Sequence, residues 1–84
     1  MKSLTTPDFW ERYRELPIEA KLLARKAYRL WRDDMHYPSL HFKKVGKYWS
    51  IRISKDYRAV AVKKGEDYIW IWIGTHREYD EFLK

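Results

Sequence analysis

The side chains of this sequence that could act on a substrate are cations and one histidine in its second half. They are Lys43, Lys44, Arg52, Arg58, His76 and Arg77. The planar fork of arginine matches the oxygens of a phosphate, and histidine changes its charge near neutral pH. The set suits a phosphodiester, with Arg52 and Arg58 as phosphate clamps and His76 as proton donor or acceptor.

Cleavage of RNA without a metal needs such groups together. It takes a base for the 2′-hydroxyl, positive charge at the scissile phosphate and an acid for the leaving 5′-oxygen. We expect Arg58, His76 and Arg52 to be the catalytic residues. Substrate binding is predicted for Lys43, Lys44, Arg77 and Tyr79, the last as a ring that stacks on a base or orients it.

Motifs for other chemistries are absent. The chain has no cysteine, no HExxH, no glycine-rich phosphate loop and no His/Cys cluster with zinc spacing. We therefore expect neither a metal nor a cofactor. The carboxylate pairs Asp33-Asp34 and Asp80-Glu81 are interpreted as solvated charges, and His36 and His41 as structural or exposed residues.

Two helices are expected to precede the cationic residues. Thr6 can cap the first helix and Pro7 suits its first position. Pro17 cannot continue that helix, so it opens a second one, which ends near Asp33. The second helix has an apolar stripe in steps of three and four, formed by Leu16, Ala20, Leu23, Ala24, Ala27, Leu30 and Trp31.

Strands are expected at residues 40–45, 48–54, 57–63 and 67–73. They are joined by short turns, and the last three should form an antiparallel meander. In the second of them Ile51 lies on a core face, whereas Ser50 and Arg52 lie on a polar face. The last is apolar on both faces, with isoleucines at 69, 71 and 73 opposite the aromatic residues at 68, 70 and 72. This indicates a covered central strand, or an aromatic patch that receives a partner's helix. A short C-terminal helix follows Gly74.

Composition favours one small basic domain over residues 1–84. Aromatic residues make up 18% of the chain, and the formal net charge is +6, which attracts polyanions. No apolar run approaches the roughly 20 residues that cross a membrane, and the N-terminus lacks the apolar segment of a signal peptide. We expect a cytoplasmic protein without membrane contact.

The order of the motifs resembles one known family. A helical hairpin is followed by DDMHYPSLHFKKV from Asp33, WSIRISKDYR from Trp49 and IGTHREY from Ile73. This order is similar to the RelE/ParE toxin superfamily, in particular its YafQ/RelE-like branch. The resemblance implies a short N-terminal strand at residues 2–5, two helices, an antiparallel meander and a C-terminal helix. Ser50 stands where relatives that cleave on the ribosome can place a lysine.

The resemblance implies a toxin that cleaves mRNA on the ribosome, with Arg58, Arg52 and His76 matching the family's catalytic positions, and Arg77 and Tyr79 matching weaker ones. It also implies a cognate antitoxin, which we expect to be acidic and to lay a helix or strand over the basic face and the aromatic patch. The alternatives are a ParE-like toxin that inhibits DNA gyrase without catalysis, and a basic RNA-binding module without toxicity.

Overall fold

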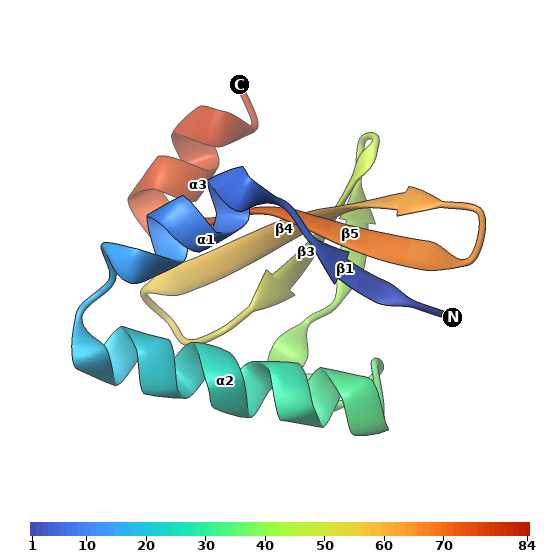
Figure 1. The fold of residues 1–84 in the computed structure, drawn as a ribbon, viewed down its shortest axis with the longest axis horizontal. Coiled ribbons are helices and arrows are strands. Elements are labelled where there is room, and N and C mark those ends of the chain that lie inside the picture. The colour runs from blue at the N-terminus through green and yellow to red at the C-terminus, as the bar shows by residue number, and fades with distance from the viewer.

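The computed structural model describes residues 1–84 and holds one five-stranded sheet with three α-helices around it (Figure 1). The strands are β1 (Ser3–Thr5), β2 (Lys43–Val45), β3 (Tyr48–Arg52), β4 (Tyr57–Lys64) and β5 (Asp67–Thr75), in the spatial order β1-β5-β4-β3-β2. The helices are α1 (Pro7–Arg14), α2 (Ile18–Asp33) and α3 (His76–Phe82). β1 is parallel to β5, and the other neighbours are antiparallel. The α+β fold expected from the sequence is confirmed.

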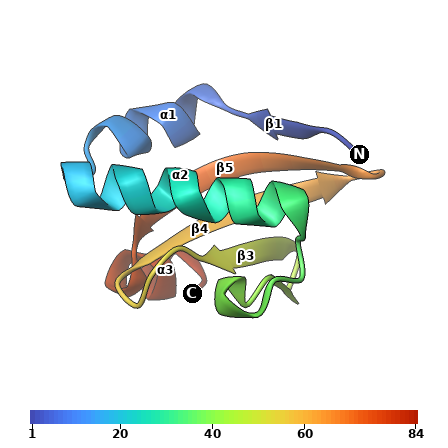
Figure 2. The same ribbon diagram turned by 90° about the horizontal axis from the view of Figure 1, so that it is seen from below.

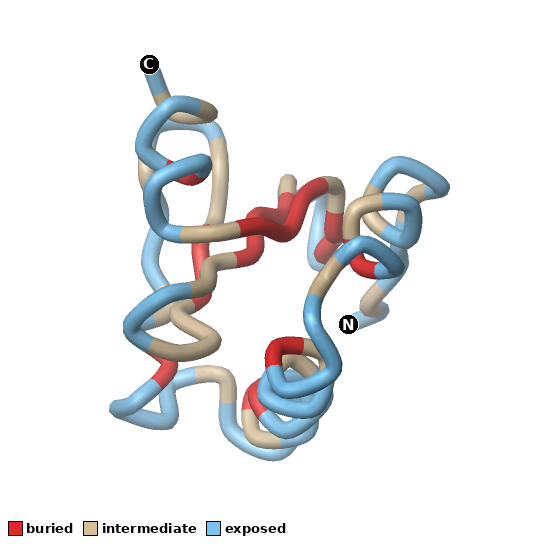
Figure 3. Tube along the Cα trace, turned by 90° about the vertical axis from the view of Figure 1, so that its left-hand side faces the viewer, coloured by how far each residue is buried: buried red, intermediate tan, exposed pale blue.

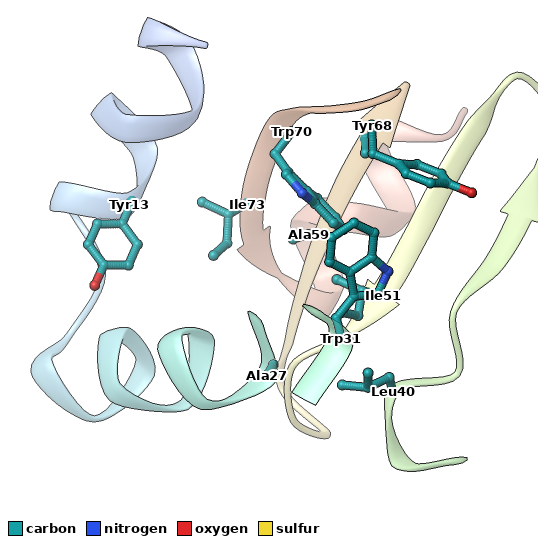
Figure 4. Packing of buried hydrophobic residues seen from close by; sticks show 10 residues of the cluster. Tyr13, Ala27, Trp31, Leu40, Ile51, Ala59, Tyr68, Trp70 and Ile73 are labelled. Carbon is teal, nitrogen blue, oxygen red and sulfur yellow. The ribbon is translucent and has the colours of Figure 1, made fainter. Parts of the chain in front are cut away.

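The helices cover the two faces of the sheet unequally (Figure 2). α2 crosses one face, while α3 lies on the other, near the ends of β4 and β5. The larger core lies between the sheet and the α1–α2 hairpin (Figure 4) and consists of Tyr13, Ala27, Trp31, Leu40, Ile51, Ala59, Ala61, Tyr68, Trp70 and Ile73. A smaller cluster of Val60, Trp72 and Tyr79 lies under α3. The face that carries α3 therefore keeps a part that no helix covers.

Large rings connect α2 to the sheet. The α2 backbone stands away from the strands, and most of its surface is exposed (Figure 3). Trp31 is 1% exposed, and its ring centroid lies 5.4 Å from that of Tyr68 and 5.3 Å from that of Trp70. The predicted stripe on α2 is thus confirmed at Trp31 and Ala27, but Leu23 is 40% exposed and lies outside the core.

The helix starts follow the sequence signals. The Thr6 side chain accepts a hydrogen bond from the backbone N–H of Phe9 at 3.2 Å, and Pro7 is the first residue of α1. Pro17 caps α2, which begins one residue later at Ile18. The predicted first strand is short but present, because Ser3–Thr5 pairs with β5 in parallel.

The strand predicted at 40–45 begins too early. Pro38–Leu40 forms a 3-10 turn that buries Leu40, and His41 has a φ of 45°, so β2 begins only at Lys43. A left-handed backbone conformation interrupts strand pairing. Ser50 was also expected on a solvated polar face, yet it is 3% exposed beside Val60. That face is covered there by the smaller cluster.

A bulge in β5 overturns the predicted alternation of that strand. Val60 pairs with Trp72 but Ala61 pairs with Trp70, which leaves Ile71 as the extra residue. Trp70 consequently joins the larger core, whereas Trp72 joins the cluster under α3. The expectation that both indoles share one face is therefore wrong, and the bulge is what directs Trp72 toward α3.

Gly74 is the position where this arrangement leaves no space for a side chain. A Cβ there would lie 2.7 Å from the Trp72 ring and 2.9 Å from the Glu78 carboxylate. Gly74→Ala is therefore expected to lower the free energy of unfolding by about 1–3 kcal/mol, measured by urea denaturation, and to shift the indole resonance of Trp72. Gly65→Ala, at a turn with open space, should leave that resonance unchanged. An unaltered midpoint for Gly74→Ala would contradict this packing.

Candidate functional site

Two arginines lie side by side on the face that α2 does not cover. Arg52 of β3 pairs in register with Arg58 of β4, and Arg58 pairs with Gly74 of β5. Because directly opposed residues of antiparallel strands point to the same face, both guanidinium groups extend from the side of the sheet that carries α3. The predicted proximity of Arg52 and Arg58 is present in the structure.

Arg58 is held in place by the backbone of the β3–β4 connection. Its guanidinium donates hydrogen bonds to the carbonyl oxygens of Ser54 and Tyr57. The pKa of Arg58 is lowered from its ordinary value, first because burial disfavours the charged form and then because of the charge of Arg52. Arginine nevertheless stays protonated at neutral pH, so Arg58 is a fixed positive charge suited to a phosphate.

His76 is the first residue of α3 and lies close to the same connection. Its backbone N–H donates to the Asp56 carbonyl at 2.7 Å. Its Nδ1 lies 3.3 Å from Oδ2 of Asp80, one helical turn later, and both side chains are about half exposed. With Nδ1 directed to the carboxylate, Nε2 is the nitrogen left free for a substrate.

An open hollow connects these elements. It is lined by Lys55, Asp56, Tyr57, Thr75, His76, Arg77 and Asp80. Arg52 and Arg58 are not in the lining. Arg58 directly follows Tyr57 in β4, and its partner Gly74 directly precedes Thr75 in β5; because Tyr57 and Thr75 both line the hollow, the arginine pair borders it. Arg77 lines the hollow together with His76, so these two predicted residues lie side by side.

The three remaining predicted residues are distributed differently. Lys43 pairs with Ser50, two residues before Arg52, and so lies on the arginine face within reach of a long side chain. Lys44 pairs with Trp49 and points to the opposite face, so the structure does not bring it to this site. Tyr79 is 8% exposed and packs in the cluster under α3. Because packing occupies its ring, the predicted stacking of Tyr79 on a base is not available in this structure.

Arg12 of α1 is a part of the site region that sequence reasoning missed. Its Nε–H donates to the Ile73 carbonyl at 2.8 Å, its guanidinium lies 4.8 Å from the Trp72 ring centroid, and its Nη2 is 3.3 Å from Glu78. Glu78 in turn forms a capping box with Thr75 at the start of α3. The T-x-x-E spacing of Thr75 and Glu78 was the signal that could have found this cap.

Glu78 also gives the start of α3 a pH dependence. Its pKa is lowered from 4.5, mainly because the carboxylate accepts the backbone N–H of Thr75, and Arg12 adds to this while burial opposes it. A lowered folded-state pKa stabilises the protein above the unfolded value, and this contribution is lost as the pH falls through the folded value. Glu78→Gln should therefore destabilise the protein at pH 7, and the gap to the wild type should close below about pH 4.5. Urea midpoints from pH 7 to acid measure this, with Glu66→Gln in an exposed turn as the control; a pH-independent gap would contradict it.

The fold is shared with solved toxin structures. A chain of the RelB–RelE antitoxin–toxin complex from Methanococcus jannaschii matches with a TM-score of 0.75 and 14% identity, covering 96% of this chain and 99% of that chain. The YoeB/ParE toxin from Agrobacterium tumefaciens matches with a TM-score of 0.67 and 19% identity, covering 90% of this chain and 99% of that chain. The isolated RelE toxin of E. coli matches with a TM-score of 0.64 and 15% identity, covering 98% of this chain and 94% of that chain. The class that the architecture defines is the RelE-like toxin fold.

A family model supports the same class at the level of sequence. The model of the ParE-like toxin domain matches residues 21–81, which is more than half of the chain. This chain therefore belongs to the ParE-like toxin family, within the RelE/ParE superfamily, and is the toxin component of a toxin–antitoxin system. A search of curated proteins finds no match. No helix in the structure has the length and apolar character needed to cross a bilayer.

Proposed function

We propose that this toxin is an endoribonuclease that cleaves mRNA on the ribosome by means of its own side chains, without a metal. One observation carries the proposal: the strand register brings the Arg52–Arg58 pair and the His76–Asp80 pair to the same end of the sheet, on the face that α2 leaves open. Like charges directly opposed across two strands reduce stability. Such a pair is expected where an anion binds between them.

Each group has a role in the cleavage. His76 Nε2 accepts the proton of the 2′-hydroxyl, and the 2′-oxygen then attacks the phosphorus. Arg58 and Arg52 hold the non-bridging oxygens, where negative charge develops. The bond from phosphorus to the 5′-oxygen breaks on the opposite side of the phosphorus, where this oxygen takes a proton from water, and the imidazolium formed in the first step releases its proton to solvent. The products are a cyclic 2′,3′-phosphate and a 5′-hydroxyl.

The openness of the site supports the ribosome as the place of cleavage. The hollow beside His76 is lined by only one hydrophobic residue and has no enclosed slot for a base. Such a surface can bind a phosphate, but it offers few contacts that would fix the conformation of a flexible RNA. An mRNA already held by the ribosome has lost most of that freedom, so the alignment needed for in-line attack comes with the substrate. Lys43 and Arg77 are then available for flanking phosphates.

The partner that restrains the toxin is proposed to be an acidic antitoxin. Solved structures with this fold include RelB–RelE complexes from Methanococcus jannaschii and Pyrococcus horikoshii. The net charge of this chain is +6, which favours an acidic polypeptide through complementary charge. Co-expression with the neighbouring reading frame, followed by co-purification, tests this pairing.

Cleavage is tested with purified protein, ribosomes and a defined mRNA. Primer extension should show cuts within the ribosomal A site, in EDTA-treated toxin as well as in untreated toxin, and these cuts should weaken by about 10²–10³-fold in Arg58→Ala. Free mRNA should be cleaved far more slowly. Intact mRNA together with accumulated cleaved DNA and an SOS response in cells would contradict the proposal and indicate gyrase inhibition.

Arg52 should affect stability and cleavage in opposite directions. Arg52→Gln removes the like charge opposite Arg58, so it is expected to raise the free energy of unfolding by about 0.2–1 kcal/mol while lowering the cleavage rate. Urea denaturation and primer extension measure the two effects. Lys64→Gln, an exposed change at the far end of β4, is the matched control and should alter neither. A less stable Arg52→Gln protein would contradict the interpretation of this pair.

A further inference from the structure

His76 is the one proposed catalytic residue that does not belong to a strand. Arg52 and Arg58 lie in paired strands, whereas His76 is the first residue of α3, a helix of seven residues. A helix of that length is not stable by itself, so its position depends on contacts with the rest of the protein. Catalytic groups must be held within about 0.5 Å of the productive geometry. The contacts that fix the start of α3 therefore affect the proposed cleavage.

The Arg12 guanidinium contacts both sides of the turn that contains His76. Its Nε donates to the carbonyl oxygen of Ile73 at 2.8 Å, near the end of β5, and its Nη2 lies 3.3 Å from Oε2 of Glu78 in α3. Thr75 and His76 lie between these two contacts along the chain. Because a guanidinium is planar and rigid, the two contacts together set the direction in which α3 leaves β5.

Glu78 extends this restraint to the backbone next to His76. Its Oε1 accepts the Thr75 backbone N–H at 2.9 Å and the Thr75 hydroxyl at 3.1 Å, and the Glu78 N–H donates to Thr75 Oγ1 at 3.1 Å. His76 follows directly, and its own N–H donates to the Asp56 carbonyl at 2.7 Å. The backbone of His76 is therefore held by the β3–β4 connection on one side and, through Glu78, by Arg12 on the other.

The surroundings of Arg12 do not suit an RNA phosphate. Arg12 is not in the lining of the hollow beside His76. It lines a different hollow, whose other charged residues are all acidic: Asp8, Glu11 and Glu15. Carboxylates repel an RNA backbone, and the guanidinium is already paired with Glu78 and lies 4.8 Å from the Trp72 ring centroid. Arg12 therefore acts on other residues of the chain and does not bind the substrate.

From these contacts we infer that Arg12 is a positioning residue for His76. It joins the end of β5 to the cap of α3 and thereby keeps the imidazole at the end of the sheet where Arg52 and Arg58 lie. The inference rests on the proposed function, because the reaction in which Arg12 takes part is the proposed cleavage. It makes α1 necessary for that reaction, although no residue of α1 lines the hollow beside His76.

Steady-state primer extension on the ribosome–mRNA complex separates positioning from the effect of charge. Arg12→Ala should lower kcat by about 10–10²-fold, the loss expected when a catalytic group is displaced by about 1 Å, and should leave KM within about twofold. Arg12→Lys keeps the charge but loses the planar fork, so its kcat should stay within about threefold of that of Arg12→Ala. Arg14→Ala removes the same charge from an exposed position of α1 and should change neither constant. A raised KM with unchanged kcat, or full activity in Arg12→Lys, would overturn the inference.

A double variant distinguishes positioning from a loss of folded protein. In a His76→Ala background the group that Arg12 positions is absent, so the addition of Arg12→Ala should change the residual rate by less than about twofold. A variant that acted only by unfolding the protein would lose the same factor in both backgrounds. Urea curves identify conditions in which every variant is folded, and the rates are compared there. Equal losses in the two backgrounds would overturn the inference.

Amide hydrogen exchange tests the geometry without RNA. Opening of the start of α3 exposes the N–H groups of Thr75 and His76, which Glu78 and Asp56 otherwise protect. Arg12→Ala should speed their exchange at least about tenfold more than that of Val60 in β4, and Arg14→Ala should leave this ratio unchanged. Unchanged exchange of Thr75 and His76 in Arg12→Ala would overturn the positioning role. If wild-type toxin makes no cuts, the proposed nuclease fails, while the exchange rates still decide whether Arg12 fixes the start of α3.

Discussion

Replacing His76 by alanine lowers the rate of A-site mRNA cleavage by about 10²–10⁴-fold, the range that a positioned general base contributes. The reason is positional. His76 is the one imidazole beside the hollow, and with Nδ1 at 3.3 Å from Asp80 it presents Nε2 to a bound ribose. Primer extension at saturating ribosome complex measures the change, which should appear in kcat because the base acts in the chemical step.

Two control variants separate chemistry from structure. His36→Ala removes an exposed histidine outside the hollow and should leave the rate unchanged. Asp80→Asn keeps an acceptor for Nδ1 but removes its charge, so it should lower the rate by less than His76→Ala. The His76→Ala protein should unfold within about 0.5 kcal/mol of the wild type, as expected for an exposed side chain. Undiminished cutting by His76→Ala would exclude the imidazole as the base.

Local sequence signals were sufficient to predict most of the fold. Thr6, Pro7 and Pro17 specify both helix starts through capping and proline geometry, and short turns specify antiparallel pairing. The bulge at Ile71 could not be predicted in this way, because it depends on which residues of β4 oppose Trp70 and Trp72. Strict alternation is the expectation only for a regular strand.

The candidate site was predictable where it depends on strand ends. Arg52, Arg58 and His76 follow from the meander, because a tight connection brings the end of β3 to the start of β4, and β5 returns to the same end. Lys44 was wrongly grouped with Lys43, since adjacent residues of a strand point to opposite faces. Arg12 lies in α1, far along the chain, and only the tertiary structure places it against Glu78.

Trp31 is the residue whose loss should most affect folding. It is 1% exposed, and its ring meets those of Phe42, Tyr68 and Trp70 edge-on. Trp31→Ala should lower the free energy of unfolding by about 3–5 kcal/mol, a large share of the roughly 5–15 kcal/mol of a whole domain. Because Trp31 connects α2 to the sheet, the same variant should also loosen the packing of α2 on the sheet. Urea denaturation measures the loss of stability.

Phenylalanine at the same position should behave very differently. The indole N–H of Trp31 is buried without a hydrogen-bond partner, and a group of that kind costs about 1–3 kcal/mol of stability. Trp31→Phe loses ring volume but also removes this unpaired donor, and the two effects oppose each other. We expect a net change within about 1.5 kcal/mol, against the much larger loss in Trp31→Ala. If phenylalanine destabilised the protein as much as alanine does, the donor would have to be satisfied in solution, with water reaching the centre of the core.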